Sequence, residues 1–161
     1  MMQVQTKSLA WLVAVDMTLV IVACLIPAVS HLFALPLYML NPMLALLLVG
    51  MAFGRDWRNA PLLAILMPLL SSLLTGMPAG GKVVCMMAEL AVVAGLFHVL
   101  INRWNAVVSV FAAIFAGKVV YYLLKAFVLA PVALVGTEWW IQLCVVLLWG
   151  GLFAMIYKSR K

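Results

Sequence analysis

The chain has 161 residues, of which 69% are hydrophobic and only 9% are charged. An ordinary soluble domain is about 45–50% apolar and about 25% charged, and a fold of this size leaves much of its surface exposed. This composition argues against a soluble enzyme, a nucleic-acid-binding module and a disordered protein. The formal net charge of +6 fits a membrane-topology signal better than a nucleic-acid interface. We predict an all-α integral membrane protein.

Six apolar runs predict six transmembrane helices in a single domain that covers residues 1–161. A spanning helix needs about 20 mostly apolar residues, and these runs lack the alternating pattern of barrel strands. In chain order, the predicted spans are 8–28, 37–53, 60–75, 83–102, 106–130 and 138–157. Pro42 interrupts the second run, and the glycine-rich segment 76–81 after the third run marks a loop.

The basic residues predict the orientation of these helices, because cytoplasmic loops carry an excess of Lys and Arg. With six spans, both termini lie on the same side of the membrane. That side would hold Lys7, Arg55, Arg58, Arg103, Lys158, Arg160 and Lys161, and the opposite side would hold only Lys82. We therefore expect both termini to be cytoplasmic.

Four ionisable residues lie within the apolar runs, where charge is costly and is a functional candidate by default: Asp16, Glu89, Lys118 and Lys125. The helical rise predicts that Glu89 and Lys125 lie at a similar depth below the outer boundary, with Lys118 nearer the middle of the membrane. In the fifth span, one stripe is formed by the residues at i, i+3, i+4 and i+7, which are Lys118, Tyr121, Tyr122 and Lys125.

The last three spans are predicted to line an outward-facing cavity, because the sixth begins with Glu138-Trp139-Trp140 and carries Gln142 one turn further on. Two ammonium groups and several aromatic rings suit a small anionic or zwitterionic solute with an apolar body. The predicted substrate-binding residues are Asn41, Ser71, Ser72, Lys82, Glu89, Lys118, Tyr121, Tyr122, Lys125, Trp139 and Gln142.

Structural interpretations of the same residues stay open. Glu89 can pair with Lys125 as a structural bridge, or Lys125 can extend its ammonium group to the outer interface. Trp139 and Trp140 can belong to an interfacial aromatic belt, and the role of Asp16 is undecided. The three cysteines lack the spacing of a metal or redox motif, and no catalytic constellation occurs. We expect no metal, no cofactor and no enzymatic activity.

Several short motifs lie in the first two thirds of the chain: Asn41-Pro42-Met43, PLLSSLLTGMP at 68–78, Met86-Met87-Ala88-Glu89-Leu90 and Gly95-Leu96. With Gly50, Gly54 and the pair Ala10 and Ala14, they resemble the substrate-binding S subunits of energy-coupling factor (ECF) transporters. The resemblance covers about residues 8–102. Ala10 and Ala14 are four residues apart, a spacing at which small side chains let another helix approach closely.

The resemblance implies an ECF-type ABC importer in the plasma (inner) membrane of a bacterium. Its S subunit would have six helices, bind a micronutrient from outside, and dock through Ala10 and Ala14 on a T subunit that works with two cytoplasmic ATPases. The outer loop with Gly76, Gly80 and Gly81 would act as a gate.

We therefore expect a binding subunit for the ATP-driven uptake of a small water-soluble vitamin or precursor. A carboxylate-bearing substrate such as pantothenate suits the two lysines best, whereas folate-like compounds, other B vitamins and queuosine precursors stay open. The partners expected are this substrate, the T subunit, the two ATPases and the lipid bilayer, with no nucleic acid. The alternative is a structural scaffold similar to the six-helix rod-shape-determining membrane protein.

Overall fold

The structure, a computed structural model, describes residues 9–34, 37–54, 59–78, 80–128 and 139–159. These residues form helices α1 (Leu9–Leu32), α2 (Pro42–Gly54), α3 (Asn59–Thr75), α4 (Gly81–Ile101), α5 (Ala106–Val128) and α6 (Trp139–Ser159), and one 3-10 helix, η1 (Leu37–Leu40). The described ranges contain no β-strand. The all-helical class predicted from the apolar runs is confirmed.

The second predicted span, 37–53, is not one continuous helix. Asn41 separates η1 from α2 with a φ of 46°, a left-handed backbone conformation. Pro42 is then the first residue of α2, a position that suits proline because its missing N–H would have no partner there. Pro42, which interrupts the second apolar run of the sequence, is therefore the start of a separate helix. The first helix also differs from its prediction, since it continues past residue 28 to Leu32.

Within the described residues, four helices are long and apolar enough to cross a membrane: Ala10–Leu32, Gly81–Ile101, Ala106–Val128 and Trp140–Lys158. Two apolar helices, Pro42–Phe53 and Asn59–Thr75, are shorter. At about 1.5 Å per residue, the 13 residues of α2 extend about 20 Å, against about 30 Å for the hydrocarbon core of a bilayer. The fold is compatible with a multi-pass membrane protein.

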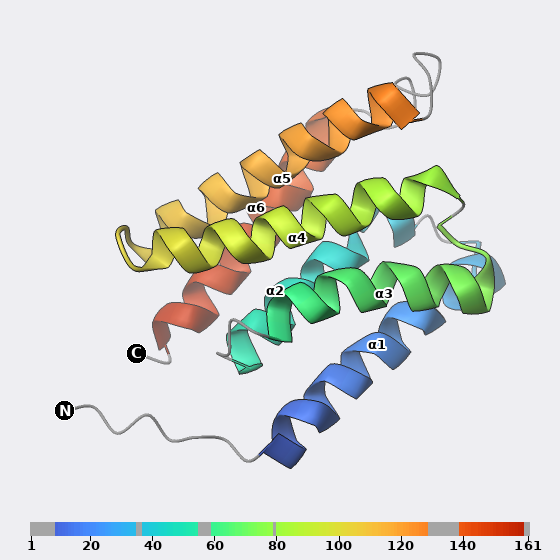
Figure 1. The fold of residues 1–161 in the computed structure, drawn as a ribbon, viewed down its shortest axis with the longest axis horizontal. Helices are drawn as coiled ribbons and strands as arrows, with labels where there is room; N and C mark the ends of the chain where they lie inside the picture. Colours follow the sequence, from blue (N-terminus) through green and yellow to red (C-terminus); the bar gives the residue numbers. More distant parts are fainter. Residues whose placement is uncertain (1–8, 35–36, 55–58, 79, 129–138, 160–161) are drawn as a thin grey trace.

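The helices lie side by side and run between the same two ends of a bundle (Figure 1). The turn from α4 to α5 and the end of α6 lie at one end, on the left of Figure 1, and α4 starts at the other end, on the right. Arg103 and Lys158 therefore lie at the end opposite to Lys82, as the charge count predicted for these three. The other basic residues used in that count, Lys7, Arg55, Arg58, Arg160 and Lys161, lie outside the described residues.

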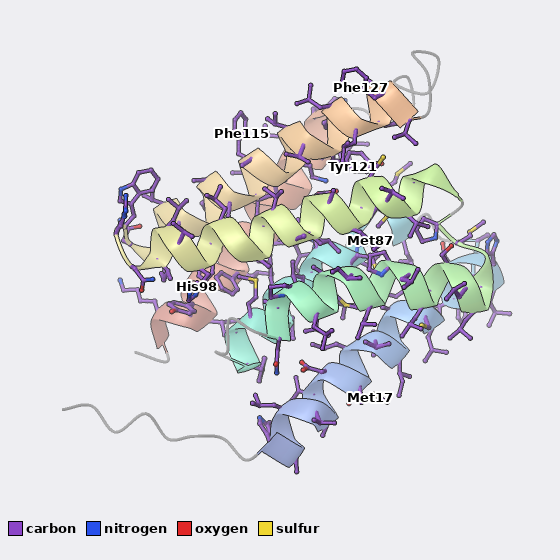
Figure 2. All side chains as sticks on the ribbon, viewed as in Figure 1. Met17, Met87, His98, Phe115, Tyr121 and Phe127 are labelled. Carbon is purple, nitrogen blue, oxygen red and sulfur yellow. The ribbon has the colours of Figure 1, made fainter. Side chains whose placement is uncertain are left out.

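The core is formed where α2 packs against α1, α3, α4 and α6. Leu44 and Leu47 of α2, Leu63 and Met67 of α3 and Leu90 of α4 are almost fully buried. The outer faces are also apolar, with Phe115 and Phe127 of α5 strongly exposed and directed away from the bundle (Figure 2). An apolar core inside an apolar surface is the pattern expected of helices surrounded by lipid tails.

Candidate functional site

A buried ion pair joins α4 to α5. The Oε1 atom of Glu89 lies 2.8 Å from the Nζ atom of Lys118, and the two side chains are only 4% and 13% exposed. The Nδ2 atom of Asn41 donates a hydrogen bond to the same carboxylate oxygen, at 3.3 Å. Because each charge has its opposite within contact distance, Glu89 and Lys118 compensate one another inside the protein.

Lys118 also reaches α6. Its Nζ atom donates to Oε1 of Gln142 at 3.2 Å, and Nε2 of Gln142 donates to the backbone carbonyl of Met39 at 3.3 Å. Four side chains from four parts of the chain are thereby linked, and we call them the polar cluster: Asn41, Glu89, Lys118 and Gln142. The polar cluster connects the break before α2 with α4, α5 and α6.

The break itself is held by α6. Because η1 ends at Leu40, the carbonyls of its last residues cannot accept hydrogen bonds from N–H groups of the same helix. Unpaired backbone groups of this kind are costly away from water. Gln142 donates to the carbonyl of Met39, and Nε1 of Trp149 donates to the carbonyl of Leu40 at 2.8 Å. These two bonds fix the irregular segment at Asn41, so the Asn41 amide is positioned beside Glu89.

Close contact between α4 and α5 depends on Gly117. A Cβ atom at this position would lie 2.6 Å from Cγ2 of Val93 and 3.0 Å from the backbone oxygen of Glu89. Only glycine therefore permits this approach without displacement of a neighbour. Since Lys118 follows Gly117, the close approach also sets the register that brings its side chain to Glu89.

The tyrosines of the predicted stripe lie beside the polar cluster. The Nζ atom of Lys118 is 5.6 Å from the ring centroid of Tyr121, within the range of a cation–π contact. The rings of Tyr121 and Tyr122 meet edge to face, with centroids 5.4 Å apart. Figure 2 shows Tyr121 on the side of α5 that faces α4. Aromatic surface and charge thus adjoin, as the spacing predicted.

Lys125 is the exception among the buried charges. It is only 8% exposed, yet in the described part of the chain it makes no hydrogen bond and no ion pair. The fully buried thiol of Cys85 on α4 is near enough to interact with it electrostatically. The alternative of a Glu89–Lys125 bridge is wrong, because Glu89 pairs with Lys118. The alternative in which Lys125 extends its ammonium group to the outer interface stays open, since Lys125 lies three residues before the end of α5.

The helix ends explain why the expected depths were wrong. Counted from Gly81, the start of α4, Glu89 lies about 12 Å along the helix axis. Counted from Val128, the end of α5, Lys118 lies about 15 Å along its axis and Lys125 about 4.5 Å. Glu89 therefore shares its level with Lys118, whereas the expected boundaries at 83 and 130 placed it level with Lys125.

Three other predicted binding residues lie elsewhere. Within the residues that the structure covers, Ser71, Ser72 and Lys82 form no hydrogen bond with the polar cluster. The hydroxyl of Ser71 is fully buried and donates to the carbonyl of Met77 at 2.8 Å, which ties the end of α3 to the following loop. Ser72 is half-buried and Lys82 is exposed. The side chain of Trp139 lies outside the described part of the structure.

The predicted gate and docking residues lie far from one another. Gly76 and Gly80 have φ values of 71° and 43°, which glycine adopts readily, whereas Gly81 is the first residue of α4. Ala10 and Ala14 are exposed on α1. Their exposure leaves the small-residue face uncovered by the described residues, and its docking role stays a prediction.

Among the residues that the structure describes, no group of three or more His, Cys, Asp and Glu side chains could hold a metal ion. Comparisons with protein-family models, curated proteins and solved structures find no match. The function must therefore be argued from the residues of the chain and their geometry.

Two contributions to this region were not predicted from the sequence: the carbonyls of Met39 and Leu40, and the indole of Trp149. Asn41-Pro42 was the available signal, because a proline inside an apolar run ends the preceding helix and leaves its carbonyls without donors. The sequence does not show which side chain supplies those donors, since Trp149 is more than 100 residues away.

Proposed function

We propose that the chain is the substrate-binding S subunit of an ECF-type ABC importer in a bacterial plasma membrane. It would bind a small water-soluble vitamin or precursor, carrying a carboxylate, from outside the cell. A T subunit and two cytoplasmic ATPases would complete the transporter. The proposal rests on the resemblance of residues 8–102 to S subunits and on the buried charges around the polar cluster.

The observation that carries the proposal is the third buried charge. An ionisable side chain within the membrane costs about 2.5–3.5 kcal/mol on insertion scales. Glu89 and Lys118 offset this cost by pairing at 2.8 Å, as a purely structural bridge would. Lys125 lies about 10 Å further along α5, is only 8% exposed and has no counter-charge among the described residues. A ligand carboxylate supplies that counter-charge, which a scaffold does not need.

The proposed topology has six spans with both termini in the cytoplasm. In this arrangement η1 and α2 together make the second crossing, since about 8 Å from the four residues of η1 adds to about 20 Å from α2. Arg103 and Lys158 then lie on the cytoplasmic side, in agreement with the positive-inside rule. Lys82 and Lys125 lie towards the outside, where the substrate arrives.

Affinity purification of the tagged chain from its own bacterium tests the proposed assembly. We expect a T subunit and two ATPases to co-purify, and reconstituted vesicles to take up substrate only with ATP. An Ala10→Leu/Ala14→Leu variant should lose the ATPases while it still binds substrate, because larger side chains prevent close helix approach. Val13→Leu, an enlargement at another exposed position of α1, is the matched control and should retain them.

The second candidate is a structural scaffold similar to the rod-shape-determining membrane protein. One observation favours it: Glu89 and Lys118 find their partners within the chain. A scaffold would co-purify with cell-wall synthesis proteins, without ATPases, and would bind no small solute. That result would refute the importer.

A further inference from the structure

We propose that one end of the bundle binds the phosphate headgroup of an anionic phospholipid. The surface consists of Arg103 and Trp104 in the turn between α4 and α5 and of Lys158 in the last turn of α6, and we call it the basic end. The proposed function uses Arg103 and Lys158 only as markers of the cytoplasmic side. Lipid binding at the basic end requires that the chain lies in a bilayer, and it does not require that the chain belongs to an importer.

An aromatic cluster holds the ends of α4 and α6 together. The ring centroid of Phe97 on α4 lies 5.1 Å from that of Phe153 and 5.7 Å from that of Tyr157, both on α6. Lys158 directly follows Tyr157, and Arg103 comes six residues after Phe97, which is about 9 Å along a helix. Figure 1 shows the turn from α4 to α5 and the end of α6 at the same end of the bundle. The two cations therefore lie on neighbouring segments, where one headgroup can contact both.

The charges of the basic end are not balanced by described acidic residues. Arg103 and Lys158 are exposed, and neither forms an ion pair with a described residue. Glu89 lies about 18 Å before the end of α4, and Asp16 belongs to α1, which packs against η1, α2 and α3. The residues outside the described structure carry more basic than acidic side chains, so they supply no net negative charge. The partner that complements this end is therefore an anion.

The apolar side chains next to the basic end favour a lipid over a soluble anion. Trp104 in the turn is 53% exposed, and Val107 and Val108 at the start of α5 and Met155, three residues before Lys158, are exposed too. An indole at the boundary between water and lipid is typical of membrane helices. Lysine and arginine at the cytoplasmic ends of such helices attract anionic lipids. Acyl chains would therefore cover the apolar side chains while the phosphate lies at the cations.

The two cations set the expected preference for an anionic lipid over a zwitterionic one. Each lysine or arginine near a membrane surface contributes about 1 kcal/mol to the binding of anionic lipid, which is about a fivefold change in Kd. Arg103 and Lys158 together predict a Kd about 30-fold lower for phosphatidylglycerol than for phosphatidylcholine with the same acyl chains. Trp104 should strengthen the binding of both lipids alike, because its contact with acyl chains does not depend on the charge of the headgroup.

Native mass spectrometry of the purified full chain, titrated with either lipid in a non-ionic detergent, measures this preference. Arg103→Gln and Lys158→Gln should each raise the Kd for phosphatidylglycerol about fivefold, and the double variant should abolish the preference. Lys82→Gln, at an exposed lysine of the opposite end, is the matched control and should keep it. Arg103→Lys, which keeps the charge, should keep it as well. Because the substituted side chains are exposed, we expect the melting temperature in detergent to be the same for all of these variants.

Equal Kd values for the two lipids overturn the inference, and so does a preference that survives in the double variant or is lost equally in Lys82→Gln. Glycerol 3-phosphate tests the headgroup without acyl chains. If it displaces phosphatidylglycerol at equal concentration, the basic end binds a soluble anion and the lipid is the wrong partner.

The importer test is separate, since neither cation belongs to the polar cluster or to the pair Ala10 and Ala14. A preference for phosphatidylglycerol without ATPase partners would keep lipid binding and refute the importer. ATPase partners without that preference would do the reverse.

Discussion

Removal of the Lys118 ammonium should destabilise the protein more than removal of both charges of its ion pair. At the observed 2.8 Å between Nζ and Oε1, the Coulomb attraction is about 6 kcal/mol at an effective dielectric constant of about 20. Most of this is offset by the cost of taking both groups out of water. Loss of one partner leaves that cost uncompensated, typically about 3–5 kcal/mol.

The expected values lie at the lower end of that range. Hydrogen bonds between membrane helices contribute only about 0.6 kcal/mol on average, because the unfolded state in the membrane also finds partners. We expect Lys118→Met to cost about 3 kcal/mol and Glu89→Gln somewhat less, since Gln142 still accepts from Lys118. With a loss of about 2 kcal/mol for Glu89→Gln and about 1 kcal/mol for the double variant, the coupling energy is about 4 kcal/mol.

Unfolding by SDS in mixed micelles, followed by the fluorescence of the six tryptophans, measures all four proteins under the same conditions. Lys158→Met removes a lysine from the exposed end of α6 and should leave the free energy of unfolding unchanged. If the losses of the two single variants simply add in the double variant, the charges do not interact, and the polar cluster does not exist as described.

Three further substitutions probe the packing around the site. Gly117→Ala should lower the free energy of unfolding by about 1–3 kcal/mol in the same SDS titration, because the added Cβ atom would clash with α4. Gly95→Ala, at a position with open space around it, should leave this free energy unchanged or raise it. Equal effects of the two substitutions would contradict the close approach of α4 and α5. Trp149→Phe should lower the free energy of unfolding by about 1–3 kcal/mol, because it leaves the carbonyl of Leu40 unpaired. It should also speed hydrogen exchange at the start of α2. Unchanged exchange would argue against the hydrogen bond from Trp149 to Leu40. Ser71→Ala should cost about 1 kcal/mol and increase proteolysis after α3, and unaltered cleavage would show that this hydroxyl does not hold the loop.

The sequence by itself determined the class of the protein and the chemistry of the site. Long apolar runs must form helices away from water, because only helices satisfy the backbone within a single segment. The separation of the fourth span from the fifth and the stripe from Lys118 to Lys125 could therefore be predicted from the sequence alone. The buried carboxylate, the two lysines and the amide of Gln142 were also identified, because ionisable and polar residues are conspicuous inside such runs.

The tertiary structure decided which of these groups meet. Depth counted along separate helices paired Glu89 with Lys125, but the contact at Gly117 and the positions of the helix ends pair it with Lys118 instead. The break at Asn41 likewise depends on donors from α6 that are distant in sequence. Register between helices is fixed by side-chain packing across the bundle, which local periodicity does not encode. That register leaves Lys125 as the buried cation with no counter-charge among the described residues.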